Sequence, residues 1–154
     1  MTVVVTGARR RAVRDGDRHV DTAHLLHALV ESDPAVREVF DGGPQLARVL
    51  GYLVQRSIGY GLRWQRTQED SGGFPAVRAP AGEGWSPSAA SAMDRAARSA
   101  LRRGELQADG LDLLAALAAD PRCRAVEVLD RAGVDAGPLG ARAADRRAAP
   151  DPLG

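Results

Sequence analysis

Apolar residues recur along the chain at the three-to-four-residue spacing of amphipathic helices. Leu25, Leu26 and Leu29 follow this spacing, and so do the apolar residues of the run from Leu46 to Val54. Residues that start and stop helices punctuate the pattern: Asp, Ser or Thr precedes most apolar segments, often with Pro at the next position, and Gly frequently follows. Strong helix formers dominate, and only 4% of the residues are aromatic. The pattern predicts an all-α protein.

The start and stop residues divide the chain into eight expected helices. The first half would hold a helix capped by Thr2 that ends near Asp15, one capped by Asp21 or Thr22, one over 34–40 and one over 44–57. The second half would hold a helix over 87–103, one capped by Asp109, one from Pro121 to near Gly133, and one capped by Asp135 that fades from Asp145 onward.

The two halves are related by an internal repeat. At an offset of 88 residues, the segment 8–29 lies on 96–117 without gaps. Identities include Gly16 with Gly104 and Asp21 with Asp109. In this Ala- and Leu-rich composition, Ala and Leu matches arise easily by chance, whereas paired Gly and Asp matches at a fixed offset do not. The repeat predicts eight helices in two pseudo-symmetric four-helix repeats.

These repeats set the expected domain organisation. Residues 1–148 would form one domain, with repeat one at about 2–58, a Gly- and Pro-rich linker at about 59–85, and repeat two at about 86–142. Residues 149–154 would form a flexible tail. Because one repeat of this size is marginally stable alone, we expect the halves to pack on each other.

Composition narrows the function classes. The chain has 21 basic and 20 acidic residues, for a net charge of +1, whereas dedicated nucleic-acid-binding domains are strongly basic. The sequence contains no Lys, so it cannot contain the phosphate-binding loop of an ATPase, which requires one. It shows neither a run of apolar residues that could cross a membrane nor a signal peptide. We therefore expect a cytoplasmic protein without a membrane partner.

Candidate chemical groups are few. His24 and His27 are three residues apart and could bind a metal with His19 or Asp21, but a helix-capping His24 and a surface His27 are the favoured interpretation. Cys123 is the single cysteine and is expected to be a semi-buried residue rather than a reactive thiol. No arrangement of residues indicates nucleophilic catalysis. We expect no metal, no cofactor and no enzymatic activity.

An arginine-rich segment supports an alternative function. It comprises Arg9, Arg10, Arg11, Arg14 and Arg18, and it could contact phosphates in a nucleic-acid-associated regulatory protein. Helical spacing spreads these side chains around more than one face, so a solvated surface is favoured and a nucleic-acid partner is not expected.

The repeat resembles the Clp N-terminal domain, the substrate- and adaptor-binding module of Clp-type AAA unfoldases such as ClpA and ClpC. That family repeats a helix ending in Gly, a Gly-Thr-Glu-His-Leu-Leu-Leu-Ala-Leu segment and a Leu-Gly-Val-Asp turn. Here residues 20–29 read Val-Asp-Thr-Ala-His-Leu-Leu-His-Ala-Leu, residues 108–117 read Ala-Asp-Gly-Leu-Asp-Leu-Leu-Ala-Ala-Leu, and residues 128–135 read Val-Leu-Asp-Arg-Ala-Gly-Val-Asp. Trp85-Ser86-Pro87 stands where the family often has an aromatic-Thr-Pro segment. The likeness covers about residues 2–142.

Because the chain has no Lys for a phosphate-binding loop, we expect a free-standing Clp N-domain without its motor, and we expect it to be a monomer. Such a module would bind proteins or peptides, including a Clp unfoldase, its adaptors or its substrates, and would deliver or sequester ligands of that protease system. The implied binding residues lie at two helix starts: Asp21, Thr22, Ala23, His24, Asp109, Gly110, Leu111 and Asp112. Ala23 and Leu111 stand where phosphoarginine-reading members carry Glu, and they lack the anionic group that a guanidinium needs.

Overall fold

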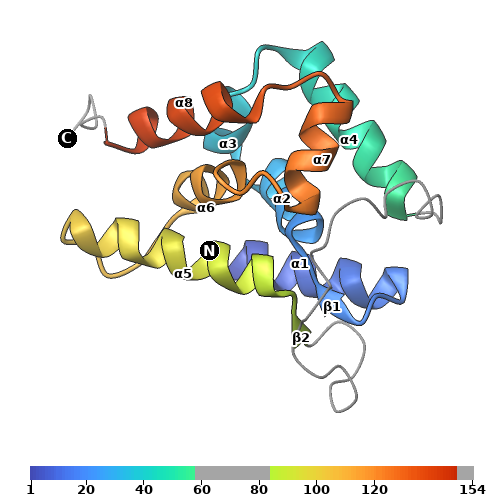
Figure 1. The fold of residues 1–154 in the computed structure, drawn as a ribbon, viewed down its shortest axis with the longest axis horizontal. Coiled ribbons are helices and arrows are strands. Elements are labelled where there is room, and N and C mark those ends of the chain that lie inside the picture. The colour runs from blue at the N-terminus through green and yellow to red at the C-terminus, as the bar shows by residue number, and fades with distance from the viewer. Residues whose placement is uncertain (58–83, 149–154) are drawn as a thin grey trace.

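The protein is helical in the residues that the structure, a computed structural model, describes, which are 1–57 and 84–148 (Figure 1). The elements in chain order are α1 (Thr2–Asp15), β1 (His19–Val20), α2 (Thr22–Ser32), α3 (Pro34–Glu38), α4 (Gly43–Ser57), β2 (Gly84–Trp85), α5 (Pro87–Arg102), α6 (Gly110–Ala118), α7 (Arg124–Arg131) and α8 (Ala136–Ala148). The all-α prediction is confirmed. Most of the expected linker and the whole expected tail lie outside the described residues. No described helix is long and apolar enough to cross a membrane.

Helices α2 and α6 form the centre of the fold. In Figure 1 they lie between a layer made by α1 and α5 and a second layer made by α3, α4, α7 and α8. Their leucines fill the core, and each is fully buried: Leu25, Leu26, Leu29, Leu113, Leu114 and Leu117. Close packing of the layers depends on small residues, because a Cβ added at Gly140 of α8 would lie 2.9 Å from Cβ of Ala118 in α6.

Glycines end helices where the sequence predicts. Gly16 follows α1 with φ of 72°, and Gly104 follows α5 with φ of 81°. Both angles lie in the left-handed region that glycine adopts without steric cost. The resulting turn after α1 reverses the chain toward β1 and the start of α2, and so places Asp15 and Asp17 beside that start.

Several expected boundaries are wrong. Thr2 does not cap α1, since Met1 precedes the helix and Thr2 is its first residue. Helix α7 begins at Arg124 rather than Pro121, because the Asp120 carboxylate accepts the Arg122 amide at 3.0 Å and holds residues 120–123 in a turn. Cys123 is the residue before α7, and it is fully buried rather than semi-buried.

Two further helices differ in length from the expectation. Helix α3 stops at Glu38, two residues before the expected end at Phe40. Helix α8 does not fade at Asp145 but continues to Ala148. Ion pairs hold its last turn: Arg146 binds Glu38, and Arg147 binds Glu105 and Asp109.

A two-residue parallel pair joins the chain before α2 to the chain before α5. Residue His19 of β1 pairs with Gly84 of β2, and Val20 pairs with Trp85. The guanidinium of Arg9 lies 5.3 Å from the centre of the Trp85 ring, a cation–π contact that ties α1 to β2. Strands this short leave no alternating pattern, and the sequence did not predict them.

Each half of the chain also caps a helix of the other half. Arg48 of α4 donates from Nε to the carbonyl of Ala132, the residue that ends α7, at 3.0 Å. Arg142 of α8 donates from Nε to the carbonyl of Val39, the residue that ends α3, also at 3.0 Å. Both bonds satisfy carbonyl groups that a helix end leaves without a partner inside the helix.

Candidate functional site

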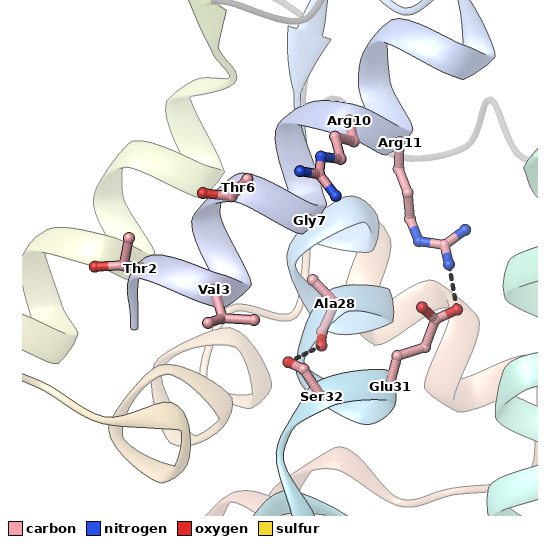
Figure 2. A pocket seen from close by; sticks show the side chains of 9 residues that line it. All are labelled: Thr2, Val3, Thr6, Gly7, Arg10, Arg11, Ala28, Glu31 and Ser32. Atoms are coloured by element: carbon pink, nitrogen blue, oxygen red, sulfur yellow. Dashed lines mark hydrogen bonds and ion pairs between the residues drawn. The ribbon is translucent and has the colours of Figure 1, made fainter.

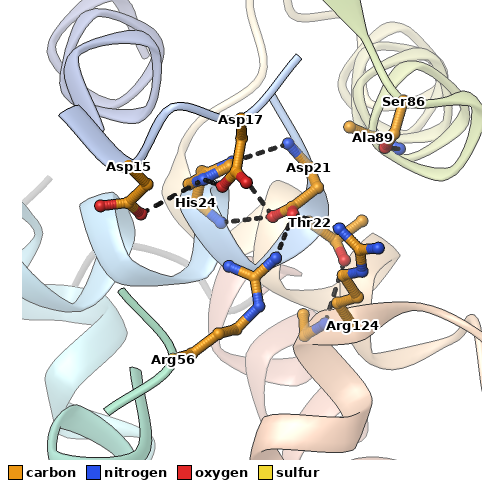
Figure 3. A network of polar contacts seen from close by, with 10 residues as sticks. Asp15, Asp17, Asp21, Thr22, His24, Arg56, Ser86, Ala89 and Arg124 are labelled. Carbon is orange, nitrogen blue, oxygen red and sulfur yellow. Dashed lines mark hydrogen bonds and ion pairs between the residues drawn. The ribbon is translucent and has the colours of Figure 1, made fainter. Parts of the chain in front are cut away.

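The start of α2 is built from Asp21 and His24 (Figure 3). The Asp21 carboxylate accepts the His24 amide at 2.9 Å, and the Asp21 amide donates to Nδ1 of His24, also at 2.9 Å. This reciprocal pair is a capping box with His in the place of the usual Glu or Gln. It confirms the prediction that His24 caps the helix.

The start of α6 repeats this arrangement 88 residues later. The Asp109 carboxylate accepts the Asp112 amide at 3.1 Å, and the Asp109 amide donates to the Asp112 carboxylate at 3.0 Å. At both starts the amide of the third helical residue is therefore already bonded within the chain. Ligands would have to meet side chains around the helix starts rather than these amides.

Two arginines bind the carboxylate of Asp21, which is 1% exposed. Arg124 donates to its Oδ2 at 2.9 Å, and Arg56 of α4 donates to the same atom. Burial alone would raise the pKa of Asp21, but the Arg56 guanidinium, His24 and Arg124 outweigh burial and hold that pKa well below its usual range. Asp21 is therefore a buried, ionised residue whose ion pairs link α2 to α4 and to the start of α7.

The other ring nitrogen of His24 faces two acidic side chains. Nε2 lies 2.8 Å from Oδ2 of Asp17 and 3.6 Å from Oδ2 of Asp15. Since Nδ1 accepts the Asp21 amide, the proton of the neutral ring is on Nε2 and is donated to Asp17. Burial disfavours the imidazolium, but the charge of Asp21 and the hydrogen bond that Nε2 donates to Asp17 outweigh it and raise the pKa of His24 above its ordinary value.

The expected surface position of His27 is wrong. Its side chain is 4% exposed and its Nε2 lies 2.9 Å from Glu31, which also binds Arg11 of α1 (Figure 2). Burial, followed by the charge of Arg11, lowers the pKa of His27 to about 4. His27 is thus a neutral core residue whose partners come from α1 and from the next turn of α2.

The start of α6 is the more open of the two. Asp109 has a side chain that is 47% exposed, whereas the side chain of Asp21 is 1% exposed. Arg103 donates to Asp112 at 2.8 Å, and Arg147 of α8 lies 2.6 Å from Asp109. Burial raises the pKa of Asp112, but the hydrogen bond from Arg103 and the charges around it lower it overall.

The remaining predicted site residues lie where one helix packs against another. The Thr22 hydroxyl accepts the Ala125 amide at 3.0 Å. Ala23 and Leu111 are both buried, at 1% and 6% exposure. A Cβ added at Gly110 would lie 2.0 Å from Oδ2 of Asp33, so the α6 start touches the residue that ends α2. The two helix starts therefore lie at opposite ends of α2, roughly 16 Å apart.

Two shallow grooves run along the N-terminal half of α1. One, of about 380 Å³, lies between α1 and the second half of α2 and reaches Ser32 (Figure 2). The other, of about 360 Å³, lies between α1 and α5 and reaches Ala108. Thr2 and Thr6 line both grooves. Ala108 precedes Asp109, so the groove beside α5 reaches the residue next to the cap of α6, whereas the other groove ends at Ser32, next to Asp33.

The sequence did not predict six of the residues around the helix starts. They are the acidic pair beside His24 and the arginines that bind the capping carboxylates: Asp15, Asp17, Arg56, Arg124, Arg103 and Arg147. Asp15-Gly16-Asp17 directly before the cap was a readable signal for the first two, because a left-handed glycine turns the chain back on itself. The arginines gave no signal, since every basic residue of the chain is arginine.

Neither a protein-family profile nor a curated protein sequence matches this chain.

Proposed function

We propose that this protein is a non-enzymatic module of the Clp N-domain type that binds proteins or peptides. It works in the cytoplasm with a Clp protease system, by delivering ligands to the unfoldase or by withholding them from it. The proposal rests on the resemblance of two helix-start segments to that family and on the surface found beside the second of them.

Correspondences between the halves support the two-repeat arrangement that the resemblance implies. The capping boxes of α2 and α6 stand at the same 88-residue offset as the left-handed glycines that end α1 and α5. The bonds from Arg48 to the end of α7 and from Arg142 to the end of α3 also link the fourth helix of each half to the third helix of the other, at offsets of 93 and 94 residues rather than 88. Such pairs are expected when one four-helix unit is duplicated and packs against its copy.

The observation that carries the binding proposal is the pair of grooves beside the N-terminal half of α1, of which the one beside α5 reaches Ala108, next to the open start of α6. Apolar side chains of the groove beside α5 include Val5 and Met93, and Val3 beside the other groove is 69% exposed. A ligand in either groove would bury apolar surface, and one that extends beyond Ala108 in the groove beside α5 would approach Asp109 and its partner Arg147. Apolar area with a polar rim is typical of protein-binding surfaces.

The ligand chemistry differs from that of the family's phosphoarginine readers. Buried Ala23 and Leu111 offer no carboxylate to a ligand's guanidinium. Asp109, half exposed, and Glu105, 36% exposed, are the acidic groups that a ligand could reach at the α6 start. We infer a preference for peptides that combine apolar side chains with a basic or polar group.

The test is affinity capture from nuclease-treated lysate of the native host, read by quantitative mass spectrometry. The variant Thr6→Arg places a long charged side chain in both grooves from an exposed position of α1. Val13→Arg is its matched control, because Val13 is 56% exposed on the same helix and lines neither groove. Both variants should keep the helical circular dichroism and the unfolding temperature of the wild type.

The expected result is that wild type and Val13→Arg enrich a Clp unfoldase, its adaptors or its substrates, and that Thr6→Arg does not. Equal enrichment by all three proteins would move the binding surface away from α1. Absence of Clp components, together with salt-sensitive recovery of nucleic acid from untreated lysate, would favour the nucleic-acid alternative.

That alternative relies on the arginine-rich segment of α1. Two arginines of this segment already have partners within the protein: Arg9 contacts Trp85, and Arg11 binds Glu31.

A further inference from the structure

Three metal-ligating side chains meet where α1 ends and α2 begins. Asp15 is the last residue of α1, Asp17 follows the left-handed Gly16, and His24 is in the first turn of α2 (Figure 3). One carboxylate oxygen of each Asp and one ring nitrogen of His24 all lie within 4.8 Å of one another. The sequence alone suggested His27 or His19 as partners of His24, and neither belongs to this group.

The separations of these atoms suit a shared ion. Nε2 of His24 lies 2.8 Å from Oδ2 of Asp17 and 3.6 Å from Oδ2 of Asp15. Ligands that each lie about 2.1 Å from one metal are separated from each other by roughly 3.0–3.4 Å in octahedral or tetrahedral geometry. The two separations from Nε2 lie within a few tenths of an ångström of that range. The two carboxylate oxygens lie within 4.8 Å of each other, and rotation of the more exposed Asp17 side chain would bring them to the separation that a shared ion needs.

The opposite side of the imidazole already carries the group that metal-bound histidines use. Oδ1 of Asp21 lies 3.1 Å from Nδ1 of His24. When Nε2 binds a metal, the ring proton resides on Nδ1, so the hydrogen bond from the Asp21 amide to Nδ1 is exchanged for one from Nδ1 to Oδ1 of Asp21, which orients the ring and increases its basicity. The two arginines that bind Asp21 contact its other oxygen, Oδ2, and leave Oδ1 on the side of His24.

The surroundings favour a cation and give it access. The site lies between the negative end of the α1 dipole and the positive end of the α2 dipole, which offset each other, so the two carboxylates supply the charge that attracts a cation. His24 and Asp15 have side chains that are 2% and 9% exposed, so they are held by the fold, whereas the side chain of Asp17 is 38% exposed and forms the opening to solvent. The two arginines at the neighbouring Asp21, Arg56 and Arg124, are engaged by its carboxylate.

We propose that Asp15, Asp17 and His24 bind one first-row divalent transition-metal ion, with zinc the best match to the donors. One imidazole and two carboxylates suit zinc, whereas Mg²⁺ and Ca²⁺ prefer oxygen ligands alone. Three protein ligands leave at least one position for water or for a side chain of a partner. The bound ion would fasten the end of α1 to the start of α2.

The test titrates the metal-free full chain with ZnCl2 by isothermal calorimetry and follows the unfolding temperature. We expect one zinc per chain and a rise of roughly 5–10 °C when zinc is about 100-fold above its dissociation constant. MgCl2 and CaCl2 should leave the unfolding temperature unchanged. Asp15→Asn should weaken zinc binding by at least about tenfold, because even indirect ligand changes have effects of that size.

Asp94→Asn and His19→Gln serve as matched controls. Asp94 lies on the exposed face of α5 and His19 on β1, outside the proposed ligand set, so both variants should bind zinc as the wild type does. If Asp15→Asn does not fold, X-ray absorption of the zinc-loaded wild type decides the question. A spectrum that shows zinc bound by one imidazole and otherwise by oxygen ligands supports the proposed site. Two or more imidazoles, unchanged binding by Asp15→Asn, or no one-to-one binding would overturn it.

Discussion

The hydroxyl of Thr22 accepts a hydrogen bond from the amide of Ala125, 103 residues later in the chain, at 3.0 Å. Ala125 is in the first turn of α7, where amides have no partner inside the helix. Cys123, which precedes α7, makes no capping bond with its side chain. Thr22 therefore supplies from the first half of the chain a cap that α7 lacks locally.

Replacing Thr22 by Val keeps the shape of the side chain and removes this acceptor. The buried Ala125 amide would then be unsatisfied, which costs about 1–3 kcal/mol. We expect the free energy of unfolding, measured in urea, to fall by that amount. Thr6→Val on the exposed face of α1 is the control, and its effect should stay within about 0.5 kcal/mol. Equal effects of both variants would contradict the role given to Thr22.

Replacement of glycine by alanine should lower the stability of the protein at Gly110 and raise it at Gly51. A Cβ at Gly110 would lie 2.0 Å from Oδ2 of Asp33, whose other oxygen caps α3 by accepting the Ala35 amide at 3.0 Å. Gly110→Ala therefore displaces a cap and should destabilise the protein by about 1–2 kcal/mol. A Cβ at Gly51, inside α4 and exposed, would meet no atom within 4 Å. Gly51→Ala should stabilise by about 0.5–1 kcal/mol. Differential scanning calorimetry distinguishes the two, and a rise in unfolding temperature for Gly110→Ala would refute the contact with Asp33.

His27 should make stability decrease in mild acid. Burial and Arg11 lower its pKa from the ordinary 6.5 to about 4 in the folded protein. The unfolded chain therefore takes up a proton that the folded protein refuses, and stability falls as the pH drops from about 6.5 towards 4. We expect His27 to contribute about 1–2 kcal/mol of loss between pH 8 and pH 5, discounted because the neighbouring Glu31 is 47% exposed.

Urea unfolding of wild type and His27→Gln at both pH values measures this contribution. The variant should lose less stability on acidification, whatever its stability at pH 8. Titration of His27 by NMR gives a second check, since Arg11→Gln removes a positive charge beside the ring and should raise its pKa. An ordinary pKa for His27 in the wild type would show that the ring is solvated.

The contribution to stability of an arginine bond between the halves can be compared with that of an arginine bonded within its own helix. Arg48→Gln removes the donor at the end of α7 and should destabilise the protein by about 1–2 kcal/mol, as loss of a charged donor to a part-buried carbonyl does. Arg102→Gln, at the end of α5, is the control: the exposed Arg102 bonds Ser99 of its own helix, and its effect should be small. Thermal unfolding followed by circular dichroism suffices for both, and a negligible effect of Arg48→Gln would mean that water replaces the guanidinium.

Local signals predicted most of the helices because their caps are local. Asp21, Ser86 and Asp109 each accept an amide three residues later, as their sequences indicate, and Gly16 and Gly104 take the left-handed conformation that ends a helix. The sequence is less informative where a distant residue decides the outcome. His27 looked exposed from its own helix, but Arg11 of α1 and the packing of α1 on α2 bury it and its partner.

The surroundings of the two helix starts were also difficult to predict where distant segments of the chain contribute to them. The pattern located both helix starts, and His24 was recognised as a cap. Apart from Arg103, their arginine partners are distant in the chain, such as Arg124, which lies 103 residues from Asp21. A sequence whose basic residues are all arginine does not distinguish Arg56 from an arginine in solvent. The turn that aims Asp15 and Asp17 at His24 could have been predicted from the intervening Gly16, but the convergence of three side chains depends on how α1 packs on α2.

The exchange of end caps between the halves has a consequence for folding cooperativity. Helix α7 receives its first-turn acceptor from Thr22 and its last-turn donor from Arg48, and α3 receives its last-turn donor from Arg142. These short helices, of five and eight residues, are far below the length at which an isolated helix persists in water. Separated from each other, the two halves would lose their third helices, so a protein that reads as two tandem units unfolds as one.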